Sequence, residues 1–366
     1  MNVISDKIGF WYDENRRDLP WRQTRDAYKI WLSEIILQQT RVAQGMDYYL
    51  KFVEAYPTVA VLAKADEDEV LKLWQGLGYY SRARNLLKAA RQVMDENGGA
   101  GTFPTTYDAL LRLKGVGRYT AAAVASLAAD EEVAVVDGNV YRVLSRLYDI
   151  AEPIDSTTGQ RLFQQLADEM LHEAVGSGHS TAGRHNQAMM ELGALQCTPT
   201  QPQCTTCCLA DHCLALSHGT VGERPVKAGR VKVRERHIAY IIYIYKDTLW
   251  VHQRGAGDIW QGLWEFVGIE QEKDASAYAA ALEQGIPILT MRHQLTHQTL
   301  YADFRLVRLD ERRDDQTQHP DIKALDKDYE RITWREWQSR AVPRLIDEAN
   351  KRLSDWIGSA DQKLQR

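Results

Sequence analysis

The chain has 366 residues, more than one hydrophobic core normally organises, so its length predicts two domains. Hydrophobic residues make up 44% and charged residues 26%, which excludes a disordered chain. The longest strongly apolar run, Ala239 to Tyr245, is too short to span a bilayer, and the N-terminus lacks the pattern of a signal peptide, so we expect a cytoplasmic protein without a membrane partner. Because the formal net charge is −5, any nucleic-acid site must be a local basic patch.

Residues 1–220 have the three- and four-residue apolar spacing of helices, broken by Gly and Pro clusters. We expect helices over residues 28–39, 67–74, 82–96, 110–113 and 119–129, and therefore an all-α domain. A linker over residues 221–236 follows, in which the run from Arg224 to Arg236 has six basic residues and one acidic residue. Its charge fits a solvated linker as well as a segment that lies along a phosphate backbone.

The remaining sequence predicts a smaller α+β domain over residues 237–358. Strands are expected over residues 237–245 and 248–253, separated by a Lys246-Asp247 turn, and further β segments over residues 289–309. Helices are expected over residues 275–284 and 334–356. The polar residues 359–366 read as a flexible tail.

Four cysteines, Cys197, Cys204, Cys207 and Cys213, form a C-x6-C-x2-C-x5-C pattern, with Cys208 as an extra neighbour. A cytosolic chain would not keep them as disulfides, and four thiolates in one short loop suit either a structural zinc ion or a [4Fe–4S] cluster. Zinc ribbons usually have two Cys-x-x-Cys knuckles, and this loop has only one. The spacing therefore favours iron–sulfur without excluding zinc.

A glycine-containing turn, Leu113-Lys114-Gly115-Val116-Gly117-Arg118-Tyr119, lies between two expected helices. Two nearby glycines let successive backbone N–H groups point outward, and the following helix N-terminus favours an anion. The turn fits a phosphate contact that is blind to base sequence, although an ordinary connection between helices has the same composition.

Two carboxylates stand in distinctive segments. Asp137 follows the apolar run Val133 to Val136 and begins an expected helix, a position that an ordinary N-cap also explains. Glu34 lies in Trp31-Leu32-Ser33-Glu34-Ile35-Ile36-Leu37-Gln38-Gln39-Thr40-Arg41, where it could equally belong to a solvated stripe of an amphipathic helix.

Together these segments resemble the endonuclease III superfamily of helix–hairpin–helix DNA glycosylases. The Glu34 segment is similar to the Ser-Glu-x-x-Leu-Gln-Gln-Thr signature of its MutY-type adenine glycosylases. The resemblance implies a helical glycosylase domain whose loop 197–213 holds a [4Fe–4S] cluster for placement on DNA, not for bond chemistry. It also makes Gly115 and Gly117 part of the DNA-binding hairpin.

The resemblance further implies the catalytic roles. Glu34 would protonate the leaving adenine with a pKa raised by burial, and Asp137 would stabilise the cationic sugar. Bifunctional relatives have a lysine where this chain has Tyr119, and a phenol cannot form the imine, so we expect a monofunctional enzyme. Tyr119 and Asn139 are expected to help hold Asp137 and the sugar.

Extraction of a base from the helix needs side chains that fill the gap and bind the base. Resemblance to the family assigns Gln39 and Tyr79 to the gap, and Arg17, Trp21 and Gln187 to the adenine pocket. The alternative for Gln39 is a polar residue at the end of a helix, and the alternative for Tyr79 is a core aromatic.

The segment Trp260 to Gly268 resembles the entrance of a Nudix fold, but the Arg-Glu-x-x-Glu-Glu metal ligands do not follow it. Without them the domain should bind and not hydrolyse. Leu295-Thr296-His297 occupies the place of the Phe-Ser-His that contacts 8-oxoguanine in MutY-type proteins. The alternative is that Thr296 and His297 merely alternate on a solvent-facing strand.

The sequence therefore predicts a monomeric base excision repair enzyme that removes adenine opposite 8-oxoguanine or guanine in double-stranded DNA. One alternative is an endonuclease III-like glycosylase and lyase for damaged pyrimidines. Another is a DNA-binding protein without catalysis. A nucleotide pyrophosphatase, the third, lacks its metal ligands.

Overall fold

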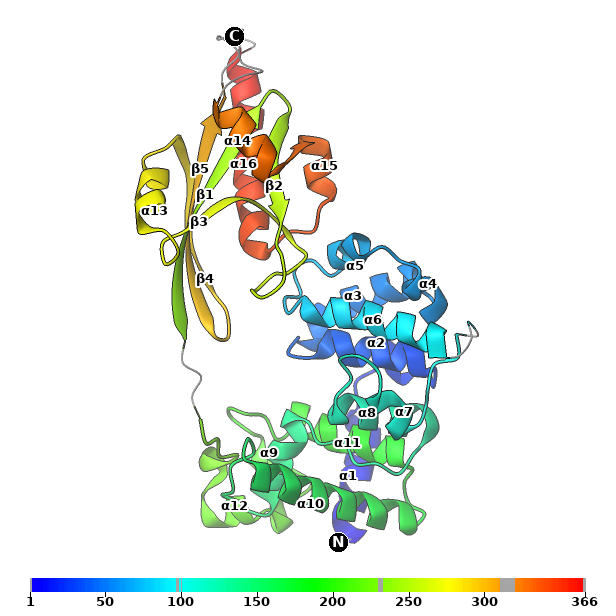
Figure 1. The fold of residues 1–366 in the computed structure, drawn as a ribbon. Coiled ribbons are helices and arrows are strands. Elements are labelled where there is room, and N and C mark those ends of the chain that lie inside the picture. Colours follow the sequence, from blue (N-terminus) through cyan, green and yellow to red (C-terminus); the bar gives the residue numbers. More distant parts are fainter. Residues whose placement is uncertain (1, 97–98, 100, 230–232, 310–319, 365–366) are drawn as a thin grey trace. The chain divides into compact units, whose positions relative to one another are not determined.

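The computed structural model describes residues 2–96, 99, 101–229, 233–309 and 320–364. The chain forms two compact units (Figure 1). The first contains Met1–Lys64 and Asn85–Arg230, and the second contains Ala65–Arg84 and Val231–Arg366. The grouping of Ala65–Arg84 with the C-terminal unit has no counterpart in the sequence pattern. None of the described helices combines the length and apolarity needed to cross a membrane.

The described part of the first unit is helical, as expected. Its helices are α1 (Asn2–Asn15), η1 (Pro20–Arg22), α2 (Ala27–Leu37), α3 (Val42–Ala55), α4 (Val59–Ala63), α6 (Ser81–Glu96, which begins in the second unit), α7 (Tyr107–Leu111), α8 (Arg118–Ala129), α9 (Gly138–Leu147), α10 (Thr157–Gly176), α11 (Ala182–Leu195) and α12 (Leu214–His218), with single turns at Cys204–Thr206, Ala210–His212 and Val221–Glu223.

Helices α8 and α11 form the centre of this unit, since α8 contacts α2, α7 and α11, and α11 contacts α1, α9 and α10 as well. Small residues allow this close packing: α8 contributes a run of buried alanines. On α11, a Cβ atom added to Gly193 would lie 2.6 Å from the Cβ of Asn139 on α9. Such close approach places side chains from α2, α8, α9 and α11 around one site.

The second unit contains α5 (Glu67–Leu73) and a six-stranded mixed sheet of order β4-β5-β1-β3-β2-β6. The strands are β1 (Arg234–Tyr245), β2 (Thr248–Gln253), β3 (Trp264–Glu270), β4 (Ile286–Gln294), β5 (Gln298–Arg308) and β6 (Glu330–Thr333), and only the β1–β5 pair is parallel. The helices of the C-terminal part are α13 (Ala275–Leu282), α14 (Pro320–Asp328), α15 (Trp334–Ser339) and α16 (Arg344–Leu364).

Alternate residues of β1 point to opposite faces of the sheet, and each face has its own core. Tyr240 packs with residues of α15 and α16 on one face, whereas Ala239 packs with residues of α13 and α14 on the other. Figure 1 shows α13 and α16 on opposite sides of the strands. The α+β expectation is therefore confirmed for this unit.

Three details differ from the expected elements. The single helix expected over 334–356 is two helices, because the residue before Pro343 is disfavoured in the helical conformation and Arg340 is already extended. Residues 295–297 form the turn between β4 and β5 and are not part of a strand. The segment expected as a flexible tail continues α16 as far as Leu364, because helix propagation adds a hydrogen bond for each residue fixed.

Two arginines of the basic run are used differently from either expectation, whereas Lys227 and Arg234 are exposed and residues 230–232 lie outside the described part. Arg224 pairs with Asp149 at 2.9 Å. Arg236 is buried in β1, where it binds Asp258 and Glu270 at 2.6 and 2.7 Å. These two guanidinium groups stabilise the protein itself and are not free for phosphate.

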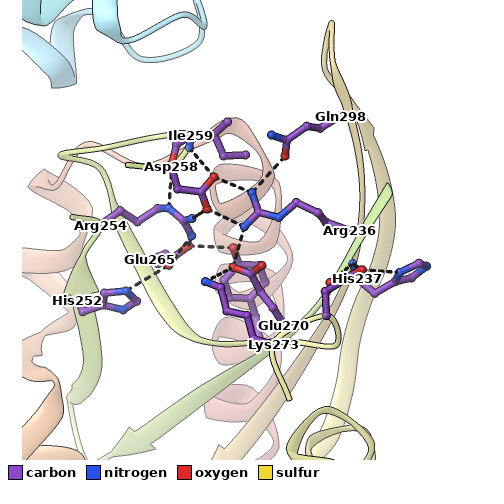
Figure 2. Close-up of polar contacts among 12 residues, drawn as sticks. Arg236, His237, His252, Arg254, Asp258, Ile259, Glu265, Glu270, Lys273 and Gln298 are labelled. Atoms are coloured by element: carbon purple, nitrogen blue, oxygen red, sulfur yellow. Dashed lines mark hydrogen bonds and ion pairs between the residues drawn. The ribbon is translucent and has the colours of Figure 1, made fainter. Parts of the chain in front are cut away.

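Figure 2 shows the buried ion-pair network around Arg236. Its second cation, Arg254, binds Glu265 at 2.7 Å, and the hydroxyl of Tyr240 donates to the same carboxylate at 2.9 Å. The buried carboxylates Glu265 and Glu270 are thus each neutralised by an arginine. This pairing agrees with a Nudix-like domain that does not use them as metal ligands.

Candidate active site

Glu34 lies on α2 and is 8% exposed, so it is not part of a solvated stripe. Burial raises the pKa of Glu34 to about 7, and the nearby charge of Asp137 adds to the rise. The hydroxyl of Tyr119, at the first turn of α8, donates to Oε2 of Glu34 and opposes part of this rise. Near neutral pH, Glu34 can therefore hold a proton and deliver it from its other oxygen, Oε1.

Tyr119 therefore hydrogen-bonds to Glu34, whereas the family resemblance predicts that it helps to hold Asp137 and the sugar. The reason is geometric, since α8 packs against α2 and its first turn faces Glu34. Burial and the charges of Glu34 and Asp137 raise the pKa of Tyr119 well above its ordinary value. The phenol therefore stays a hydrogen-bond donor throughout the physiological pH range.

Asp137 is the N-cap of α9, so the ordinary role considered for it is real. Its Oδ1 accepts hydrogen bonds from the backbone N–H groups of Asn139 and Val140 at 2.9 and 2.8 Å. The Asn139 side chain donates to Oδ2 at 2.7 Å, as expected. Burial raises the pKa of Asp137, but these three donors favour the carboxylate and limit the rise. The helix cap and the candidate catalytic carboxylate are thus the same group.

The end of α2 and the hairpin turn present the other predicted residues of this region. Gln39 follows the helix, is exposed, and adopts a left-handed conformation with φ of 55°. Gly115 has φ of 78°, and a Cβ atom there would lie 2.6 Å from the Cβ of Asn85, so the turn requires glycine. Gly117 caps α8 without a side chain, and both glycines are exposed. The hairpin backbone is therefore accessible to a phosphate.

Arg17 is committed to an ion pair. Glu191 on α11 is 1% exposed and receives two charged partners, Arg17 at 2.6 Å and Arg22 at 2.7 Å. Burial alone would raise the pKa of Glu191, but the hydrogen bonds from both arginines outweigh it and bring the pKa down to about 2. Arg22 also lowers the pKa of Glu34 through its charge, so this ion-pair group lies near Glu34.

Gln187 lies one helical turn before Glu191 on α11, on the same face. The hydroxyl of Tyr12, on α1, donates to Oε1 of Gln187. This contact leaves the amide N–H groups of Gln187 available to an acceptor on a base. Trp21 is 7% exposed, and its ring meets that of Tyr49 edge-on with the ring centroids 5.1 Å apart. The Trp21 ring is therefore part of the core and does not form the wall of an open pocket.

The sequence reasoning missed Tyr12, Arg22 and Glu191. The spacing of Gln187 and Glu191 by four residues was the available signal, because it places both on one helix face. Their partners lie about 170 positions earlier in the chain, and nothing local in the sequence identifies them.

The four cysteines of the proposed metal loop come together. The thiols of Cys204 and Cys213 each interact electrostatically with those of Cys197 and Cys207, and none of the five cysteines is in a disulfide. Within the described residues, no three His, Cys, Asp or Glu side chains form a group that could hold a metal ion in this conformation. The donor set fits a thiolate-bound group, and Arg146 supplies a cation 3.4 Å from the sulfur of Cys197.

Arg142 links this loop to the carboxylate. Its side chain is 8% exposed and donates to the backbone oxygens of Cys197 at 2.6 Å and Gly193 at 2.7 Å. It also donates to Oδ1 of Asn139 at 2.8 Å, which leaves the amide of Asn139 facing Asp137. The position of Asp137 therefore depends on the backbone of the cysteine loop.

In the second unit, the lesion-reading candidates surround a cavity of about 670 Å³. Its lining comes from the turn at residues 76–84, from Asp258 to Trp260, and from residues 293–298. Tyr79, 44% exposed with φ of 48°, bonds through its hydroxyl to Oγ1 of Thr296 at 2.5 Å. Leu295 packs against the sheet core, whereas Thr296 and His297 are exposed in the turn. Tyr79 and Thr296 thus lie together.

Comparison with known proteins agrees with both units. Residues 32–168 match the HhH-GPD superfamily of base excision DNA repair proteins, and residues 239–351 match the NUDIX domain. A thermostable thymine-DNA glycosylase has a similar structure, with a TM-score of 0.53 and 30% identity over 59% of this chain and 96% of that one. The fold and these matches define a helix–hairpin–helix DNA glycosylase, a hydrolase of N-glycosyl bonds, with a Nudix-like domain attached.

Within that class the chain belongs to the adenine DNA glycosylase family. It is 33% identical to the adenine DNA glycosylase of Buchnera aphidicola subsp. Schizaphis graminum, over 84% of this chain and 88% of that protein. It is 45% identical to the adenine DNA glycosylase of Rattus norvegicus over 60% of this chain, and it covers 42% of the length of that relative.

Proposed function

We propose that this enzyme hydrolyses the N-glycosidic bond of adenine opposite 8-oxoguanine or guanine in duplex DNA, as a monomer and without strand cleavage. The observation that carries the proposal is the buried acid Glu34, with a pKa of about 7, beside the carboxylate of Asp137. One group can give a proton while the other remains an anion. This division of roles is what cleavage through a cationic sugar requires.

Glu34 protonates the extruded adenine, which turns the base into a better leaving group. Asp137, held by Asn139 and by two backbone N–H groups, stabilises the oxocarbenium ion, and water completes the hydrolysis. Tyr119 fixes Glu34 and offers no amine for a Schiff base. The enzyme is therefore monofunctional, in contrast to an endonuclease III-like lyase.

The amide of Gln187, which Tyr12 orients, binds the adenine, and Arg17 and Trp21 support this part of the site through the ion pair with Glu191 and through core packing. Gln39 and Tyr79 fill the gap that the base leaves. The Gly115 and Gly117 backbone holds a phosphate. Leu295, Thr296 and His297 read the opposite base from the C-terminal unit.

Cys197, Cys204, Cys207 and Cys213 hold a [4Fe–4S] cluster, and Cys208 stays outside the set. The spacing with a single Cys-x-x-Cys pair supports a cluster over zinc. When bound, the cluster supplies structure to the loop and takes no part in glycosidic bond cleavage. A domain division at residues 220 and 236 and a cytoplasmic location stay predictions.

The decisive test incubates the purified protein with duplexes that carry adenine opposite 8-oxoguanine, guanine or thymine, followed by hot alkali to cleave abasic sites. We expect excision opposite 8-oxoguanine and guanine and little opposite thymine. Cleavage before alkali would favour the lyase, and DNA binding without excision would favour a non-catalytic protein.

A further inference from the structure

Three arginines of the C-terminal unit surround a groove of about 550 Å³ between β4 and α16. Arg344 and Arg352 lie on α16 with Glu348 between them, and Arg292 lies on β4. All three arginines are exposed. In the described part of the chain, none of them forms an ion pair with a carboxylate, unlike Arg236, Arg254 and the other paired arginines of this unit.

The spacing along α16 puts the charges on one side of the helix. Residues 344, 348 and 352 are four positions apart and share one face. At 1.5 Å per residue, Arg344 and Arg352 lie about 12 Å apart along the axis, which is roughly the rise of three to four phosphates of one DNA strand. Glu348, the single carboxylate that lines the groove, shares Lys351 with Asp347, at 3.1 and 3.2 Å.

The groove adjoins the cavity of about 670 Å³. Part of the lining of that cavity is the turn Leu295-Thr296-His297, which we call the reading turn. His293, Gln294 and Arg344 line both the groove and the cavity. Burial and the charge of Arg344 lower the pKa of His293, so that ring stays neutral and the positive charge of the groove comes from the arginines. A duplex whose base pair reaches Thr296 would therefore bring its backbone over this surface.

We propose that Arg292, Arg344 and Arg352 form a binding site for the phosphate backbone of the duplex beside the inspected base pair. The inference rests on the proposed function, because the reading turn places the duplex. Guanidinium groups bind phosphate through two N–H groups at once, and phosphate contacts position a protein without reading sequence. In a chain with net charge −5, such a local site offsets the general repulsion from DNA.

The test measures binding of the full chain by fluorescence anisotropy between 50 and 200 mM KCl. One duplex carries adenine opposite 8-oxoguanine, and a second of equal length is undamaged. The variants are built in an Asp137→Asn background so that excision during the measurement is slow. Each phosphate contact contributes about 0.9 to the slope of log K against log salt. The double variant Arg344→Gln, Arg352→Gln should therefore lower the magnitude of this slope by about 1.8.

At about 100 mM salt the same relation gives about an 8-fold weaker affinity for each arginine removed. We expect equal losses for both duplexes. Glu348→Gln should tighten binding, and Arg344→Lys with Arg352→Lys should keep most of the slope. Lys327→Gln is the matched control, because this exposed lysine lies on α14, on the opposite face of the sheet. It should leave the slope unchanged.

Two results would overturn the proposal. In the first, the double Gln variant, folded by circular dichroism, keeps the wild-type slope. In the second, its loss is confined to the 8-oxoguanine duplex, which would make the arginines lesion readers. Absence of excision by the wild type would refute the proposed function and leave the salt slope readable.

Discussion

Replacement of Glu34 by Gln should abolish excision and yet stabilise the free protein at high pH. The pKa of Glu34 is raised from its ordinary 4.5 to about 7, so the folded state holds a proton that the unfolded state has released between these values. Stability therefore falls as pH rises through this window. Above pH 7, the buried charge costs about 3 kcal/mol, at 1.36 kcal/mol for each pKa unit.

Glutamine has nearly the same shape, accepts the Tyr119 hydrogen bond and never ionises. The free energy of unfolding of Glu34→Gln should exceed that of the wild type by about 1.4 kcal/mol at pH 5.5 and by about 3 kcal/mol at pH 8.5, from the same linkage. Denaturant unfolding at both pH values measures the difference. Glu54→Gln, at an exposed position of α3, is the control and should show no such growth.

If the difference in free energy of unfolding between Glu34→Gln and the wild type does not grow with pH, the reasoning is refuted, because burial would then not be raising the pKa of Glu34. The catalytic side of the same argument uses the wild type. Single-turnover excision of adenine should decline as pH rises through about 7, where Glu34 loses its proton. In Glu34→Gln, excision should fall by at least about 10²-fold at every pH.

The other predictions concern the anion, the missing amine, the reading turn and the pocket. Asp137→Asn keeps a competent helix cap, so it should fold and bind DNA but lose about 10²–10³-fold in excision; a near wild-type single-turnover rate would exclude the electrostatic role. Borohydride should trap little complex of wild type with DNA and more of Tyr119→Lys, and strong trapping by wild type would point to a lyase. Thr296→Ala with His297→Ala should reduce the preference for adenine opposite 8-oxoguanine over guanine, by about 1–3 kcal/mol if the turn reads the lesion, while slow excision persists. Tyr12→Phe should slow excision about 10-fold by freeing the amide of Gln187, and an unchanged rate would show that this orientation is unimportant.

Local sequence patterns predicted part of this fold, because helix periodicity and strand alternation are encoded by near neighbours, but α1, α3, α10 and α11 were not among the expected helices. The extents of α2 and α8 agree with the expected helices to within two residues. Resemblance to a family, and not pattern, selected Glu34 and Asp137 from 50 acidic residues. The hydrogen bond from Tyr119 to Glu34 could not be predicted from the sequence, because it depends on the packing of α8 against α2.

The same limit explains Arg236. Its place in a basic run suggested a side chain that faces solvent or binds phosphate. The strand order instead places Arg236 between Asp258 and Glu270, and that order depends on contacts across the whole sheet. A buried arginine needs such partners, and only the folded sheet reveals them.

The grouping of Ala65–Arg84 with the C-terminal unit has a consequence for synthesis on the ribosome. Lys72 donates to the backbone oxygens of Gln338 and Arg340, Gln75 bonds to Asp347, and Tyr80 donates to the backbone of Val342. At roughly 5–20 residues per second, these partners are made about 14–55 s after Lys72. The segment must therefore wait with unsatisfied contacts while the helices on both sides of it in the sequence fold. A nascent chain stalled near residue 230 should expose residues 65–84 to protease, and release of the completed chain should protect them.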